Sequence, residues 1–317
     1  MRRATCKVQR AGRATCDVPR ARTTCHVLRA FAFSATVVAA GLCAPLHSQQ
    51  PPTGAPAAAA VSRIVSLVPA VTEMLFALGA GPKVVGVSSF DHFPPEVERI
   101  QRVGALLDPD VERILSLRPD LVVVYRSQSD VLAQLGRANI PVFVYAHAGL
   151  ADVTLTLRQI GQRIGAAAAA ERLAGDIDRR VDALRTASAK SARPRTLVVF
   201  ARDSFALRGI YASGGIGFVH DMVTAAGAEN VFADTKREAV QATTELIIAG
   251  APDVILELRA EPMDSATKAR ELRTWSSLKS VPAVRLGKVW MIDDARPVIP
   301  GPRVAEGIEL LAAALKR

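Results

Sequence analysis

Cysteine is missing from most of this sequence. All four cysteines lie at or before Cys43, so the remaining residues carry no thiol. This absence excludes cysteine catalysis, disulfide bridges and thiolate metal sites beyond that position. It also suits an oxidising compartment outside the cytoplasm, where thiols are not kept reduced.

Histidine is scarce as well. Beyond position 48 the chain has only His92, His147 and His220, and their spacing matches no zinc or manganese motif. The sequence therefore predicts no directly bound metal ion.

Motifs for enzymatic catalysis are also absent. Ser89 and Ser213 are candidate nucleophiles, but neither lies in a Gly-x-Ser-x-Gly turn, and no motif places a histidine as a base. An acid pair such as Asp91 with Glu257 is the alternative for an exported hydrolase, although no pattern joins the two. We expect no catalytic residues, with such an enzyme as the competing class.

Long apolar runs are limited to one segment near the N-terminus. Residues 30–44 are apolar except for Ser34 and Thr36, and this run is shorter than the roughly 20 residues of a membrane helix. Residues 1–29 before it hold seven arginines and one lysine against one acid. A basic segment followed by a short apolar one is typical of an export signal, and we predict a leader over residues 1–48.

Two features of this leader, and the segment that follows it, bear on processing and location. Near-copies of an Arg-x-Thr-Cys unit at its start fit no zinc pattern, and they indicate that translation begins downstream of Met1. Cys43 is a weak candidate for lipid attachment. Residues 49–60, rich in proline and alanine, indicate a flexible tether into the folded part of an exported protein.

The basic charge belongs mostly to the leader. Residues 1–48 hold eight of the 40 basic residues and one of the 30 acids, so the net charge falls from +10 to +3 without them. No basic face for nucleic acid is therefore expected in the remaining chain.

A pattern of glutamate, proline and aspartate occurs twice. Residues 110–120 and 243–253 each combine a short helix with a glutamate in its first turn, Glu112 or Glu245, a Pro-Asp stop, and a following apolar strand. Acids favour helix starts for electrostatic reasons alone. Repetition of the whole frame indicates two lobes of similar build, with one acid on each to dock on a two-fold symmetric partner.

Apolar strands alternate with helices along the chain, which indicates parallel α/β layers. We expect an N-terminal lobe over residues 61–165, a connecting helix over 166–192 and a C-terminal lobe over 193–317, with a ligand cleft between the lobes. Strands are expected at the following residues: 63–68, 84–87, 121–125, 142–145, 196–200, 254–258, 283–286 and 288–292.

Several motifs occur in the order found in one known family. They are the stretches at residues 64–73, 85–95, 111–124, 212–215 and 230–232. Over roughly residues 61–315 the chain resembles the periplasmic substrate-binding proteins of ABC importers for vitamin B12 and iron chelates, most closely the cobalamin-binding branch. The resemblance implies two Rossmann-like lobes with parallel-type sheets, joined by one long backbone helix, as in class III periplasmic binding proteins.

The resemblance also implies partners. In the family one glutamate on each lobe docks onto arginines of the inner-membrane permease, and Glu112 and Glu245 occupy those positions. The protein would bind a large metal chelate as a transported ligand, act as a monomer and carry no cofactor of its own.

Aromatic side chains are the first candidates for ligand contact. The resemblance places Phe90, Phe93 and Tyr125 at the cleft, where rings cover a large flat ligand at low entropic cost. Arg126 follows directly. Where cobalamin proteins place tryptophans, this chain has Leu106 and, approximately, Ala239.

These departures leave ferric siderophore or haem as the alternative ligand. Phe205, Arg208, Tyr211 and Arg259 are candidates in the second lobe, where arginines could hold carboxylates. His92 lies between two aromatics and could coordinate a chelated metal, although a hydrogen-bonded loop histidine is the simpler interpretation.

Overall fold

The computed structural model describes residues 61–189 and 192–317. The predicted leader, Cys43 and the tether lie outside the described residues. The part that contains strands β1 to β5 is called the N-lobe, and the part that contains β6 to β11 is called the C-lobe.

The N-lobe is built on a parallel sheet in the order β3-β2-β1-β4-β5. Its strands are short and apolar because helices cover them, and β4 is buried along almost its whole length. The elements are β1 (Ile64–Ser66), α1 (Pro69–Ala77), η1 (Gly81–Lys83), β2 (Val84–Val87), η2 (Pro95–Arg99), β3 (Gln101–Arg102), α2 (Val111–Ser116), β4 (Leu121–Tyr125), α3 (Ser129–Arg137) and β5 (Val142–Tyr145).

The C-lobe has a mixed sheet in the order β11-β10-β6-β7-β9, with β8 beside the start of β6. Strands β10 and β11 run parallel to β6, as predicted, whereas β7 is antiparallel to β6 and to β9. The elements are β6 (Arg195–Ala201), β7 (Ile210–Ser213), α6 (Phe218–Ala225), β8 (Glu229–Asn230), β9 (Ala239–Ala242), α7 (Thr244–Gly250), β10 (Val254–Arg259), α8 (Ser265–Arg273), η3 (Thr274–Ser277), α9 (Pro282–Arg285), β11 (Val289–Asp293) and α10 (Val304–Leu315).

The α/β fold class is confirmed, with two local corrections. The turn between β6 and β7 is too short for a crossover helix, so β7 returns as a hairpin. The predicted strand at residues 283–286 is wrong, because those residues fall in helix α9 and its C-cap. Pro282 at the first turn favours a helix start, and Ala283 buries its side chain in the C-lobe core.

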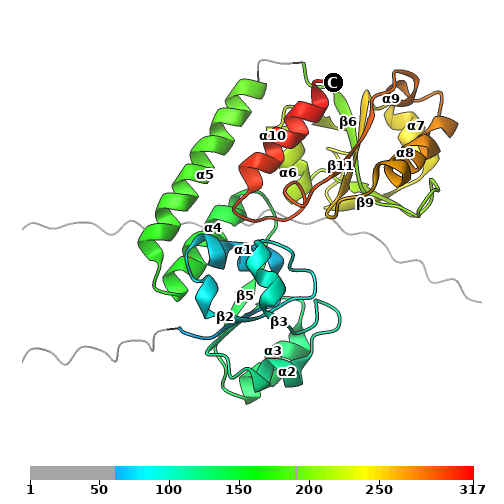
Figure 1. Cartoon of the computed structure of the whole chain (residues 1–317). Helices are drawn as coiled ribbons and strands as arrows, with labels where there is room; N and C mark the ends of the chain where they lie inside the picture. The colour runs from blue at the N-terminus through cyan, green and yellow to red at the C-terminus, as the bar shows by residue number, and fades with distance from the viewer. Residues whose placement is uncertain (1–60, 190–191) are drawn as a thin grey trace, which may run out of the picture. The chain divides into compact units, whose positions relative to one another are not determined.

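Two helices connect the lobes. Helix α4 (Ala151–Arg163) and the long helix α5 (Ala167–Ser188, green in Figure 1) are separated by a turn at Gly165, whose φ of +78° suits glycine. Helix α5 lies beside both α4 and α10. Within residues 61–189 and 192–317, no helix combines the length and apolarity needed to span a membrane.

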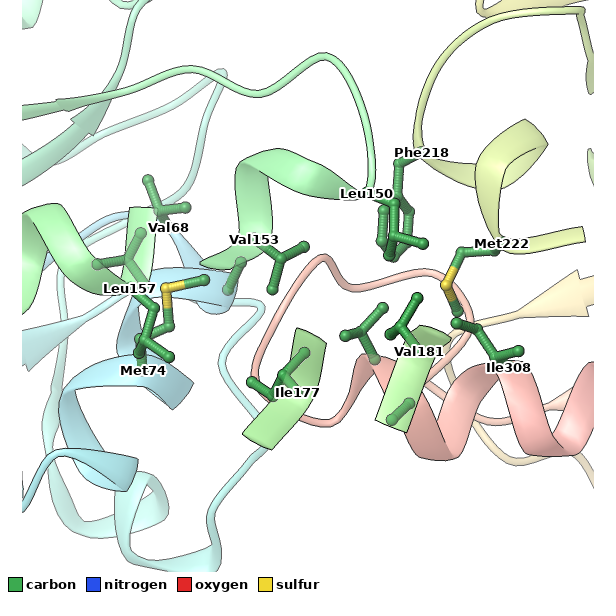
Figure 2. Close-up of a cluster of buried hydrophobic side chains, with 14 of the residues drawn as sticks. Val68, Met74, Leu150, Val153, Leu157, Ile177, Val181, Phe218, Met222 and Ile308 are labelled. Atoms are coloured by element: carbon green, nitrogen blue, oxygen red, sulfur yellow. The ribbon is translucent and has the colours of Figure 1, made fainter. Parts of the chain in front are cut away.

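The largest of three apolar clusters among the described residues extends from the N-lobe into the C-lobe. Figure 2 shows Met74 of α1 and Leu157 of α4 at one end, Ile177 of α5 between, and Met222 of α6 with Ile308 of α10 at the other end. All five side chains are at most 3% exposed. Since one packed cluster contains side chains from both lobes, large independent movements of the lobes would expose apolar surface.

The two copies of the glutamate-proline-aspartate frame make equivalent hydrogen bonds in the two lobes. Asp120 accepts hydrogen bonds from the backbone N–H groups at the start of the N-lobe (2.8 Å from Ser62 and 3.0 Å from Arg63). Asp253 accepts one from the backbone N–H of Arg195, the first residue of β6, at 3.0 Å.

The two arginines at these strand starts also act alike. Arg63 donates to the carbonyl of Leu117 at the end of α2 (2.7 Å), and Arg195 donates to the carbonyl of Gly250 at the end of α7 (2.9 Å). Each frame therefore fixes the helix that carries its glutamate to the first strand of its lobe.

Close packing of α4 against α5 yields a testable prediction. A Cβ at Gly161 would lie 2.2 Å from Cβ of Ala170, so Gly161→Ala should destabilise the protein by roughly 1–3 kcal/mol. Gly136→Ala is the matched control, because nothing lies within 4 Å of its added Cβ, and it should stabilise α3 by about 0.5–1 kcal/mol. Chemical denaturation measures both, and equal effects would contradict the packing role of Gly161.

Candidate binding cleft

A cavity of about 460 Å³ lies between residues of the two lobes. Its walls come mostly from loops that follow β1, β2, β4, β5, β10 and β11, which are parallel strands whose carboxyl ends commonly form binding sites. The lining residues are Pro69, Ala70, Glu73, Phe90, His92, Phe93, Tyr125, Tyr145, His147, Ala260, Glu261, Ala295, Val298, Ile299, Pro300 and Arg303.

Four of the predicted ligand residues meet at this cavity: Phe90, His92, Phe93 and Tyr125. Phe90 and Phe93 are 62% and 40% exposed, a large fraction for phenylalanine. Apolar rings left open to solvent in a concave site mark it as a place for a ligand with apolar surface.

The other five predicted residues do not line this cavity. Arg126 follows Tyr125 and is exposed outside the cavity lining, and Tyr211 is exposed on β7. Arg208 is exposed beside Asp203 (3.7 Å), and Arg259 is half-buried beside Glu257 (3.5 Å).

Phe205 belongs to a loop that is attached to helix α8. Its backbone N–H donates to Oε2 of Glu271 at 3.1 Å, and the guanidinium of Arg270 lies 4.5 Å from the centre of its ring. Arg202 supports the same loop, since its buried guanidinium contacts Glu257 at 2.7 Å and Glu271 at 2.8 Å. The loop therefore presents its aromatic ring to α8 and not to the cavity.

Tyr125, Tyr145 and His147 form a row of rings in the cavity wall, and the sequence interpretation missed the last two. Tyr125 meets Tyr145 edge-on (5.7 Å between centroids), Tyr145 stacks on His147 (5.9 Å), and His147 meets Phe218 of the C-lobe edge-on (5.7 Å). Tyr145 and His147 are two residues apart at the end of β5, so their side chains share a face. That spacing was the available signal.

His92 lies at the rim of the cavity between acids of both lobes. Its Nδ1 is 3.7 Å from Glu98, and its Nε2 is 3.9 Å from Glu261 of the C-lobe. Both contacts are solvent-exposed, so each contributes little energy.

The strongest polar contact between the lobes lies in the cavity wall. Arg303, just before α10, donates through Nε to Oε2 of Glu73 at 2.9 Å and through Nη2 to Oε1 at 2.5 Å. Its guanidinium also lies 3.7 Å from the ring centre of Phe93. Neither Glu73 nor Arg303 was predicted, because they are 230 positions apart.

Asp91 is buried within the loop that carries three of the lining side chains, Phe90, His92 and Phe93. It is 1% exposed, and neither carboxylate oxygen has a hydrogen-bond partner among the described residues. The nearby hydroxyl of Thr72 donates to the carbonyl of Val68 instead (3.2 Å). Burial raises the pKa of Asp91 to about 7.

The structure does not bring together Asp91 and Glu257, the acid pair considered for a hydrolase. Glu257, the imagined acidic partner of Asp91, is held by Arg202 and by the indole N–H of Trp275 within the C-lobe. In the part of the chain that the structure describes, no three His, Cys, Asp or Glu side chains are grouped as a metal site.

The two predicted docking acids are exposed. Glu112 lies in the first turn of α2 and Glu245 in the first turn of α7. Leu115 and Ile248, each three residues further along, are also exposed on the same helices (38% and 44%). The repeat therefore places an acid and an aliphatic side chain together on each lobe.

Comparison with known proteins gives consistent results. A family model for periplasmic binding proteins matches residues 64–295. The ABC transporter substrate-binding lipoprotein YvrC of Bacillus subtilis is 31% identical over 258 residues, which cover 80% of this chain and 79% of that protein. A vitamin B12-binding protein of Salmonella typhimurium is 30% identical over 237 residues, or 73% of this chain and 84% of that protein.

A solved structure has the same fold. The periplasmic heme-binding protein RhuT from Roseiflexus sp. RS-1, in apo form, superposes with a TM-score of 0.70 at 29% identity. The match covers 80% of this chain and 97% of RhuT.

The buried Asp91 predicts how stability depends on pH. Its pKa in the folded protein, about 7, lies above its ordinary value of 3.8, so between these values the folded state holds a proton that the unfolded state releases. This residue's contribution to stability should therefore fall as pH rises from about 4 to about 7.

Asp91→Asn should remove that dependence and stabilise the protein at pH 8 by about 1–3 kcal/mol, because no charge is then buried. Denaturant melts at pH 5 and pH 8 measure the effect. Asp108→Asn, at an exposed aspartate of the same lobe, is the control. A stability difference between pH 5 and pH 8 that is the same in Asp91→Asn and wild type would refute this role for Asp91.

Proposed function

The chain belongs to the periplasmic binding protein family, and from that premise we propose that it captures a corrinoid of the vitamin B12 type for an ABC importer. Homologues of this kind are substrate-binding transport proteins and not enzymes. The cavity supplies what a large chelate requires, namely exposed rings for its flat surface and polar groups at the edges.

The observation that favours a corrinoid is the charge of the cavity. Its charged lining residues are two glutamates, Glu73 and Glu261, and one arginine, Arg303, which is already paired with Glu73. Haem carries two carboxylates, and many ferric siderophores are anionic, so both need free positive charge in the site. Cobalamin carries neutral carboxamides at its periphery and needs hydrogen-bonding groups instead.

Haem is the second candidate. It is supported by the likeness to RhuT and by Tyr125, Tyr145 and His147 in one wall, since tyrosine and histidine are common ligands of haem iron. Burial raises the pKa of Tyr145 and lowers the pKa of His147, so both side chains are neutral at pH 7.

The proposed partner is an inner-membrane permease of two-fold symmetry. Glu112 and Glu245 would each meet a basic residue of one permease subunit, which the repeated frame supports. We place the protein in the periplasm as a monomer, with lipid attachment at Cys43 as an option that the lipoprotein relative supports.

Cyanocobalamin should co-elute with the protein at one-to-one stoichiometry on a desalting column, read by corrin absorbance. The chain without its predicted leader is used. Phe90→Ala should weaken binding about 10-fold, because an exposed ring of the cavity is lost. Phe205→Ala removes an exposed ring that does not line the cavity and should leave binding unchanged. A protein peak without corrin would exclude the corrinoid proposal.

Docking is tested by uptake of radiolabelled cyanocobalamin in cells that depend on this protein. Glu112→Ala combined with Glu245→Ala should reduce uptake at least about 10-fold while ligand affinity stays constant, because two charged contacts are lost. Glu96→Ala combined with Glu309→Ala, two exposed acids outside the repeated frame, is the matched control. Unchanged uptake in the first variant would exclude the docking role.

A further inference from the structure

Arg303 is the one arginine that lines the cavity within residues 61–189 and 192–317, and its charge is compensated. Two of its three nitrogens donate to the two oxygens of Glu73, at 2.9 Å and 2.5 Å. A bidentate pair of this kind fixes the plane of the guanidinium. Phe93 holds the same plane from one side, 3.7 Å from ring centre to Cζ.

The third nitrogen remains available. Nη1 of Arg303 has no hydrogen-bond acceptor among the described residues, and the side chain keeps 20% of its surface exposed. A guanidinium fixed along one edge by Glu73 and on one face by Phe93 presents its remaining N–H groups in a set direction. Nη1 is therefore a pre-oriented donor at the cavity wall.

Glu73 is placed to keep Arg303 neutralised. Its side chain, in the middle of α1, is 3% exposed, and Gly301 lies so close that an added Cβ would be 3.0 Å from Oε2. Burial raises the pKa of Glu73, while hydrogen bonds and the charge of Arg303 oppose that rise. The carboxylate is thus buried, and both of its oxygens are held by Arg303.

A ligand carboxylate would meet an unfavourable charge at this wall. To reach Nη1 it would lie close to Glu73, and Glu261 lines the same cavity. Glu73 is buried, so solvent screens its repulsion of a carboxylate only weakly, whereas the exposed Glu261 contributes less. A neutral carbonyl accepts from Nη1 without that repulsion.

We propose that Glu73 sets the charge selectivity of the cavity. By pairing with Arg303 it leaves Nη1 as a donor for a neutral carbonyl, such as a peripheral carboxamide of a corrinoid, and it disfavours a carboxylate on the same scaffold. The identity of the natural ligand in this proposal rests on the proposed function. Glu73 and Arg303 would then be specificity-determining residues.

The experiment compares amide and acid forms of two scaffolds by fluorescence quenching or calorimetry. The probes are cyanocobalamin with its three propionate monocarboxylic acids, and hemin bis-amide with hemin. Wild-type protein should bind the amide form at least about 5-fold more tightly than the most disfavoured acid form of the same scaffold. In Glu73→Gln, the charge of Arg303 is uncompensated. The ratio of the affinity for the amide form to the affinity for that acid form should therefore fall by about 10-fold or more.

Two further variants separate this role from general charge and from misfolding. Glu261→Gln removes one negative charge from the cavity without changing the partner of Arg303, so its ratio should shift much less than that of Glu73→Gln. Glu73→Gln combined with Arg303→Gln should lose the gain for acids. Each variant is first shown to melt cooperatively. If Glu73→Gln alone does not fold, the double variant is compared with wild type: loss of the amide preference supports the proposal, and an unchanged preference would overturn it.

The outcomes distinguish the two proposals. If hemin and its bis-amide bind but corrinoids do not, the corrinoid function is wrong, and the hemin pair alone decides the role of Glu73. Equal shifts in Glu73→Gln and Glu261→Gln, no amide preference in wild type, or no binding of any probe would overturn the selectivity proposal.

Discussion

Packing of both lobes against helix α5 is the constraint on which the cleft depends. Side chains of α1 and α4 from one lobe, and of α6 and α10 from the other, share one buried cluster with Ile177 and Val181. Separating these side chains would expose apolar surface, at a free-energy cost of about 25 cal/mol for each Å². The cavity walls are therefore held in position by this core, to which the lining residues Ala70 and Tyr145 belong.

The polar contacts in the cleft act on top of this framework. Arg303 links the C-lobe to Glu73 and Phe93 of the N-lobe, while the exposed contacts of His92 add little. Breaking a buried ion pair is costly because it leaves a charge without a partner. The same contact that joins the lobes consequently fixes the electrostatic character of the binding surface.

Local patterns in the sequence were sufficient for most of the fold. Apolar runs such as residues 121–125 and 254–258 became central strands, and the duplicated frame became α2 and α7. The ion pair in the cavity wall could not be predicted, because Glu73 and Arg303 are 230 positions apart and meet only through the tertiary fold. The loop with Phe205 was expected at the cleft because it follows a strand. A buried ion network around Arg202, invisible in sequence, attaches it to α8.

The hydrogen bonds that fix each duplicated helix to its own lobe have a geometric consequence. Asp120 and Arg63 hold α2 to the first strand of the N-lobe, and Asp253 and Arg195 do the same for α7 in the C-lobe. Neither Glu112 nor Glu245 can therefore drift independently of the sheet beneath it. The distance between these two carboxylates therefore depends on the angle between the lobes. It reports on the outer surface how far the cleft is closed.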